Sequence, residues 1–196
     1  MTSLWVVVMV TSILEKRTLG SAKTREGRVQ FLGPATRRNR QKQATAPTES
    51  FLLFRVGEET YGIGLQGIRE VLEPTESRVI LPAGYQVCMA LPYRGQRLPV
   101  IRMRALFDVS PDETSGTARV LVVHEGGRAV GLLVDEVLGV AEVDPQRISP
   151  LPAMATLLDP ALFRGVVVRQ DRPVVLVSER GLAGFDEVGA FYAASA

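Results

Sequence analysis

The sequence predicts an all-β protein built from two small five-stranded barrels. Between residues 51 and 177, short runs rich in valine, leucine and isoleucine are separated by Gly and Pro turns. The second half of this region repeats the first at a fixed offset of 69 residues. Strands do not alternate with long helical patterns, which argues against a parallel α/β sheet.

The first series of elements starts where apolar residues replace the polar leader, near residue 51. Each expected strand is a short apolar run that ends at a Gly or Pro turn. In order, we expect a hairpin at 51–56 and 61–63 around the turn 57–59, a strand at 68–72, a turn at 94–95, a strand at 98–101, a helical turn within 102–107 and a loop at 111–117.

The second series has the same pattern of short apolar runs and Gly or Pro turns. It ends in the segment that most resembles a helix. That helix is expected because Leu182, Phe185, Val188 and Phe191 recur at helical spacing. In order, we expect a hairpin at 119–124 and 129–134 around Gly126-Gly127, a strand at 137–143, a hairpin at 166–168 and 174–177, and a helix at 181–194.

The internal repeat supports a duplicated unit, because glycines as well as apolar residues fall in register. Each copy is about 60–70 residues long, which suits one five-stranded barrel with a thin core. Two joined barrels cover each other's apolar surface and leave a groove between them, which is a natural docking site. At an offset of 69 the matched pairs are Leu52/Leu121, Gly57/Gly126, Gly62/Gly131 and Val71/Val140.

The charge is divided unevenly along the chain. Residues 1–50 carry nine Lys/Arg and three Asp/Glu, whereas residues 51–196 carry 14 and 18. We therefore expect a disordered basic leader and linker over 1–50 and a folded domain over 51–196. An alternative is a small barrel that binds nucleic acid or anionic lipid through the basic segment. The apolar run 4–10 is much shorter than the ~20 residues of a membrane span.

Residues that could support catalysis or bind a cofactor are sparse. The single histidine, His124, lies in an expected strand and has no second His or Cys nearby for a zinc site. Asp135 and Glu136 are adjacent, so in a strand they would point to opposite faces and could not act together. The lone cysteine, Cys88, excludes an intrachain disulfide and fits a cytoplasmic protein. The sequence predicts no enzyme, no cofactor and no metal site.

A series of short motifs spans residues 51–185 in a characteristic order. They are Phe51-Leu52-Leu53-Phe54, Gly57 to Ile63, Ile68-Arg69-Glu70-Val71, Arg94 to Ile101, Val130 to Val137, Ile148-Ser149-Pro150 and Phe163-Arg164-Gly165. Together they resemble the CheW family of bacterial chemotaxis adaptors. The resemblance implies two intertwined SH3-like barrels in the cytoplasm. It also implies a scaffold that couples methyl-accepting chemoreceptors to a CheA-type histidine kinase.

The resemblance also implies a set of protein-binding residues. Arg94 and Gly95 match the family's Arg-Gly docking turn, and Ile68 and Glu70 match strand positions used in binding. From strand alternation we expect Ile68 and Glu70 on one face. Arg119 and Val120 match a further groove position. Next to the docking turn this chain has Pro92-Tyr93 where the family usually has Asn-Leu, and it has Arg102 in place of an acidic residue.

Overall fold

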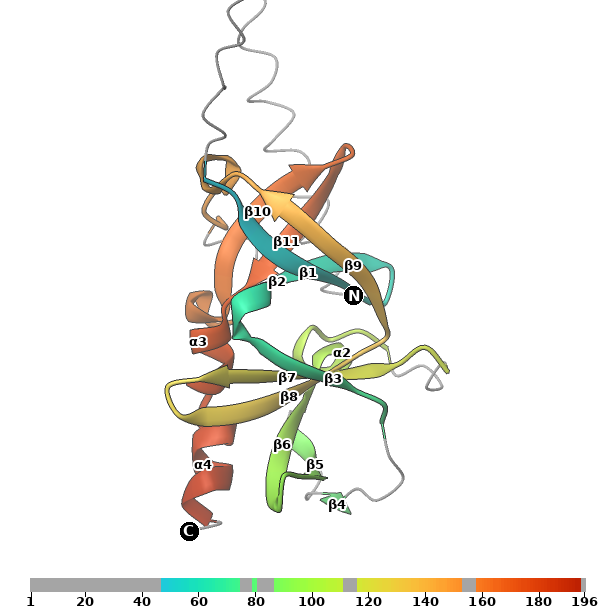
Figure 1. The fold of residues 1–196 in the computed structure, drawn as a ribbon, viewed down its shortest axis with the longest axis vertical. Helices are drawn as coiled ribbons and strands as arrows, with labels where there is room; N and C mark the ends of the chain where they lie inside the picture. The colour runs from blue at the N-terminus through green and yellow to red at the C-terminus, as the bar shows by residue number, and fades with distance from the viewer. Residues whose placement is uncertain (1–46, 75–78, 81–86, 111–115, 153–157, 195–196) are drawn as a thin grey trace, which may run out of the picture.

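The computed structural model describes residues 47–74, 79–80, 87–110, 116–152 and 158–194. They form two antiparallel-rich sheets with a few short helices (Figure 1), so the all-β prediction is confirmed. The strands are β1 (Glu49–Val56), β2 (Glu59–Gly64), β3 (Ile68–Leu72), β4 (Val79–Ile80), β5 (Val87–Tyr93), β6 (Gln96–Arg102), β7 (Arg119–Glu125), β8 (Arg128–Val134), β9 (Glu136–Val143), β10 (Phe163–Arg169) and β11 (Arg172–Val177). The helices are η1 (Leu65–Gly67), α2 (Met103–Leu106), η2 (Pro145–Arg147), η4 (Pro160–Leu162), α3 (Glu179–Ala183) and α4 (Asp186–Ala194).

Each sheet makes one of the two SH3-like barrels. Barrel A has the strand order β10-β11-β2-β1-β9, and barrel B has the order β3-β7-β8-β6-β5-β4. An antiparallel bridge between Ser149 and Val166 brings the chain after β9 back to β10. Barrel B has one strand more than the five expected, because the two-residue β4 pairs with β5.

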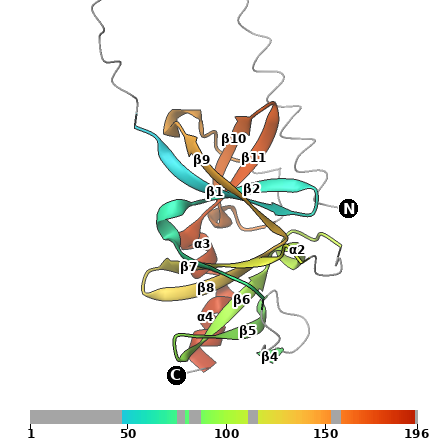
Figure 2. The same cartoon turned by 45° about the vertical axis from the view of Figure 1, so that its right-hand side comes forward.

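The two barrels do not coincide with the two sequence copies. Hairpin β1–β2 of the first copy pairs with β9 and β11 of the second, and hairpin β7–β8 of the second pairs with β3 and β6 of the first. Figure 2 shows the consequence: blue and orange strands share one barrel, and green and yellow strands share the other. The copies have exchanged their hairpins, so neither copy closes a barrel alone.

The in-register glycines Gly62 and Gly131 lie where the exchanged strands run parallel. A Cβ at Gly62 would lie 2.8 Å from Leu176 Cδ2, and one at Gly131 would lie 2.9 Å from Val100 Cγ2. These separations are shorter than real Cβ contacts, so a side chain at either position would force the neighbouring side chains of β11 or β6 to shift. The repeated glycines are therefore explained by packing of the exchanged strands.

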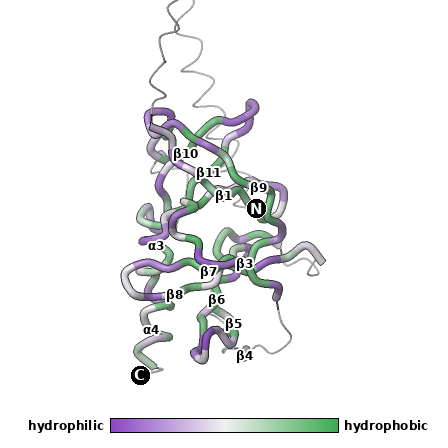
Figure 3. The backbone as a smooth tube through the Cα atoms, in the orientation of Figure 1, coloured by the Kyte–Doolittle hydropathy of each residue, from purple (hydrophilic) through white to green (hydrophobic). Residues whose placement is uncertain are grey.

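The main core lies between the barrels and is shared by both. Leu52, Phe54 and Ile63 enter it from barrel A, and Leu121 and Leu132 enter it from barrel B. Separate smaller clusters fill barrel A, around Phe51 and Leu176, and barrel B, around Val100 and Val120. Figure 3 shows that the strands are largely apolar and that turns such as β10–β11 are polar. As expected, each barrel covers apolar surface of the other.

Two boundary predictions need correction. The linker ends earlier than residue 50, because Glu49 and Ser50 already pair with Val143 and Glu142 in β9. The expected helix over 181–194 is two helices, since Gly184 terminates α3 before α4 begins. The rest of the predicted leader, residues 1–46, lies outside the described residues. Among the residues described, no helix is long and apolar enough to cross a membrane.

Candidate docking surface

Strand β3 carries a β-bulge that divides the predicted binding residues between two faces. Ile68 pairs with Val123, but Glu70 pairs with Val122, so two steps along β3 match one step along β7. Val122 and Val123 point to opposite sides of the sheet, and their partners do the same. The expectation that Ile68 and Glu70 share a face is therefore wrong: Ile68 packs against the shared core, and Glu70 does not.

Glu70 instead lies at an open hollow at one end of barrel B. The hollow has a volume of about 420 Å³. Strand β3 forms one side, and the β5–β6 hairpin forms the other. Its lining combines apolar side chains with two carboxylates and one guanidinium: Leu72, Leu91, Pro92 and Tyr93, with Glu70, Glu73 and Arg94.

Arg94 is presented by a tight turn at the rim of this hollow. Arg94 and Gly95 have φ values of 48° and 78°, the pair of positive angles typical of a two-residue type I′ hairpin turn. The Arg94 side chain is 74% exposed, and its Nη2 lies 3.5 Å from Glu70 Oε2. Its guanidinium carbon lies 5.2 Å from the centre of the Tyr93 ring. The structure thus places Arg94, Gly95 and Glu70 together.

Arg119 lies near the same hollow, on β7. It forms an ion pair of 3.6 Å with Glu73 and donates a hydrogen bond of 2.7 Å to the carbonyl of Ala118. The neighbouring Val120 is 0% exposed and packs with Leu91 and Val100 inside barrel B. Val120 therefore supports the wall of the hollow from within, and its side chain is not available to contact a partner.

A second exposed feature runs along the free edges of both sheets, and sequence reasoning did not single it out. Val71 on β3 is 44% exposed and Val140 on β9 is 52% exposed. Val71 pairs with Leu121, and Val140 pairs with Leu52. Both partners belong to the shared core, so both valines stand on the sides of the sheets that face the other barrel. The offset of 69 already matched Val71 with Val140 and could have identified this pair.

The correspondence between the edge strands β3 and β9 extends to their β-bulges. In barrel A, Val137 pairs with Phe54 and Gly139 pairs with Leu53, so β9 carries its bulge at Leu138. This is the position that matches Arg69 at an offset of 69. The edge strands β3 and β9 are thus related in register, bulge and exposed valine.

A metal site in the described part of the chain would need a cluster of side chains that could bind the ion. No group of three or more His, Cys, Asp or Glu that could hold a metal ion is found among the described residues. His124 is an exposed strand residue on β7. The surface features that stand out are the exposed valines, the open hollow and the projecting guanidinium of Arg94. A surface of this kind suits contact with another protein.

Comparison with known proteins identifies the family of this chain. A family model described as the CheW-like domain matches residues 50–184. The chain belongs to the CheW-like domain family. It is 27% identical to the chemotaxis protein CheW of Rhizobium meliloti (strain 1021) over 139 residues, which cover 71% of this chain and 90% of that protein.

A solved structure gives the same relationship in three dimensions. The CheW-like fold matches the crystal structure of the scaffolding protein TtCheW from Thermoanaerobacter tengcongensis with a TM-score of 0.61 and 26% identity, over 67% of this chain and 90% of that one. The chain is also 32% identical over 90 residues to the chemotaxis protein CheA of Salmonella typhimurium (strain LT2), covering 45% of this chain and 13% of that protein. These relatives do not favour the alternative of a nucleic-acid or lipid binder.

Proposed function

We propose that this CheW-like protein is a chemotaxis adaptor that couples chemoreceptors to a CheA-type histidine kinase. The observation that carries the proposal is the family match across residues 50–184, which covers all the strands except the first residue of β1. Similarity to a 90-residue part of a CheA protein supports the kinase as a partner, because a scaffold and a kinase with similar regions can build similar interfaces. The adaptor would act in the cytoplasm and would change kinase activity through contact, without catalysing a reaction.

The hollow beside Arg94 supplies a mechanism for partner recognition. The ion pair between Arg94 and Glu70 spans 3.5 Å and joins two exposed side chains. Such exposed pairs contribute little stability. A partner carboxylate can therefore replace Glu70 at low cost, and the planar guanidinium can bind it through two hydrogen bonds. Tyr93 restricts the arginine by stacking, and Leu72 and Leu91 offer apolar contact beside it.

Replacing Arg94 tests this mechanism. We expect Arg94→Ala to weaken binding to a CheA-type kinase about tenfold or more, because such an arginine is a typical hot-spot residue. The melting temperature should stay close to that of the wild type, since the side chain is 74% exposed. Affinity can be measured by titrating labelled full-length protein with kinase.

Arg97→Ala is the matched control, because Arg97 is an exposed arginine on the same hairpin and does not line the hollow. It should leave the affinity nearly unchanged. If Arg94→Ala lowers the melting temperature and the affinity together, Arg94 is a structural residue and the assignment of the docking site fails.

A further inference from the structure

Among the described residues, two strand-to-strand connections pass between the barrels, and each leads directly into a strand at the edge of its sheet. The first passage is η1, which joins β2 of barrel A to β3 of barrel B. The second is the single residue Asp135, which joins β8 of barrel B to β9 of barrel A. The relative position of the β3 and β9 edges therefore depends on how these passages are held.

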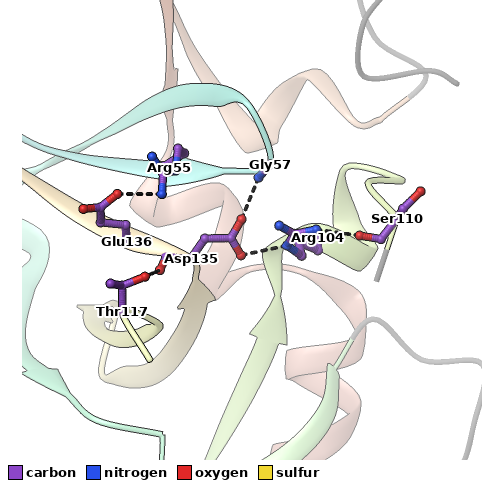
Figure 4. A network of polar contacts seen from close by, with 7 residues as sticks. All are labelled: Arg55, Gly57, Arg104, Ser110, Thr117, Asp135 and Glu136. Carbon is purple, nitrogen blue, oxygen red and sulfur yellow. Dashed lines mark hydrogen bonds and ion pairs between the residues drawn. The ribbon is translucent and has the colours of Figure 1, made fainter. Parts of the chain in front are cut away.

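Asp135 accepts hydrogen bonds from residues of both halves of the molecule (Figure 4). Its Oδ2 accepts a hydrogen bond of 2.7 Å from the backbone N–H of Gly57, in the β1–β2 turn of barrel A. Its Oδ1 accepts one of 2.8 Å from Nε of Arg104, in α2 beside barrel B. Its own backbone N–H donates to the carbonyl of Arg55 at 3.0 Å. One residue thus links elements that are far apart in the sequence.

The other half of this contact is also fixed in place. Arg104 Nη1 donates a hydrogen bond of 2.6 Å to the carbonyl of Ser110, which holds the guanidinium beside the passage. The side chains of Asp135 and Arg104 are only 18% and 21% exposed, so water screens their attraction less than it screens a surface pair. The neighbouring pair Arg55–Glu136 is more exposed, at 44% and 34%.

The first passage is held differently. Glu179 of α3 lies close against η1, and a Cβ at Gly67 would lie 2.6 Å from Glu179 Cγ. That passage is confined by close packing against glycine, whereas the Asp135 passage is confined by a charge pair and directed hydrogen bonds. A change of charge at Asp135 should therefore loosen one edge strand and leave the other in place.

We propose that Asp135 and Arg104 are positioning residues that set the angle between the barrels and hence the distance between the β3 and β9 edges. The consequence for binding rests on the adaptor function proposed above: a partner that contacts both edge strands would meet them in one fixed relative position. Asp135 does not itself touch that partner. It acts by holding the β3 and β9 edges in one position relative to each other.

The distance between the edges can be measured without any partner. Spin labels at Arg69→Cys and Leu138→Cys occupy equivalent bulge positions on β3 and β9, in a Cys88→Ser background of the full-length chain. We expect a narrow distance distribution in this protein and a broader or shifted one after Asp135→Asn. Kinase affinity, measured in parallel without labels, should fall at least fivefold.

Glu136→Gln is the matched control, because it removes a carboxylate from the next residue and breaks only the more exposed pair. It should change neither the distribution nor the affinity. If Asp135→Asn does not fold, Arg104→Lys keeps the positive charge and removes the Nε donor, and it should also broaden the distribution. An unchanged distribution in the folded variant overturns the proposal, even if the melting temperature falls. A wild-type chain that binds no kinase would instead overturn the adaptor function, and the distances would still decide the role of Asp135.

Discussion

Substituting Val120 and Val71 in turn separates the effect of core packing on stability from the effect of surface contact on binding. Val120 is 0% exposed, so Val120→Ala loses the transfer free energy of about two methylene equivalents, or ~1.6 kcal/mol. A residual cavity of ~50 Å³ adds about 1 kcal/mol at ~24 cal/mol per Å³. The total of about 2–3 kcal/mol should lower the melting temperature by roughly 5–10 °C. Kinase affinity, measured well below that temperature, should change less than threefold (roughly 0.6 kcal/mol).

Val71→Ala is the same chemical change at an exposed site. Because Val71 is 44% exposed, the loss of stability should stay below about 1 kcal/mol. Its affinity for the partner should fall more than that of Val120→Ala, since Val71 is available for contact. Urea denaturation and a binding titration on both variants give the comparison. The reasoning is refuted if Val120→Ala weakens binding more than Val71→Ala while its stability remains that of the wild type.

Two further predictions concern the packing of a strand and the protonation of a carboxyl. Gly131→Ala should cost about 1–3 kcal/mol, because its Cβ would lie 2.9 Å from Val100 Cγ2, whereas Gly116→Ala meets nothing within 4 Å and should be nearly neutral in a urea melt. A stable Gly131→Ala would contradict the glycine argument. Burial raises the pKa of Glu59 above its ordinary 4.5, and the nearby Arg172 offsets this in part. The folded state therefore keeps this proton to higher pH than the unfolded chain, so the contribution of Glu59 to stability is lost as pH rises from about 4.5 through the raised pKa. Melting temperatures between about pH 4 and pH 7 should show less of this loss in Glu59→Gln than in the wild type, and identical slopes would argue against it.

Local patterns predicted most strands of this fold, but not β4 or β5. The turn at Gly126-Gly127 and the short helix after β6 are found where the sequence indicated. These features depend on neighbouring residues, such as glycines that accept positive φ, so a local pattern is sufficient. The turn at Arg94-Gly95 could be predicted for the same reason.

Features that depend on residues distant in the sequence could not be predicted from local patterns. The bulge in β3 exists only in the register with β7, so alternation along β3 alone placed Ile68 and Glu70 on one face. Val120 looks like any strand valine until the packing of β5, β6 and β7 buries it. The sequence showed Asp135 only as one of two adjacent carboxylates, and its hydrogen-bond partners Gly57 and Arg104 lie far from it in the sequence.

The exchanged hairpins also impose an order on folding during synthesis. Barrel B is encoded by one uninterrupted stretch from β3 to β8, whereas barrel A joins β1 to strands that end at Val177. The β1–β2 hairpin is therefore synthesised before its partners β9 and β11. Until they are made, its apolar side can pack against barrel B. The stretch from β3 to β8 thus forms the surface on which the β1–β2 hairpin and the strands from β9 onward assemble, and a chain that stops before β11 leaves β2 without its parallel neighbour.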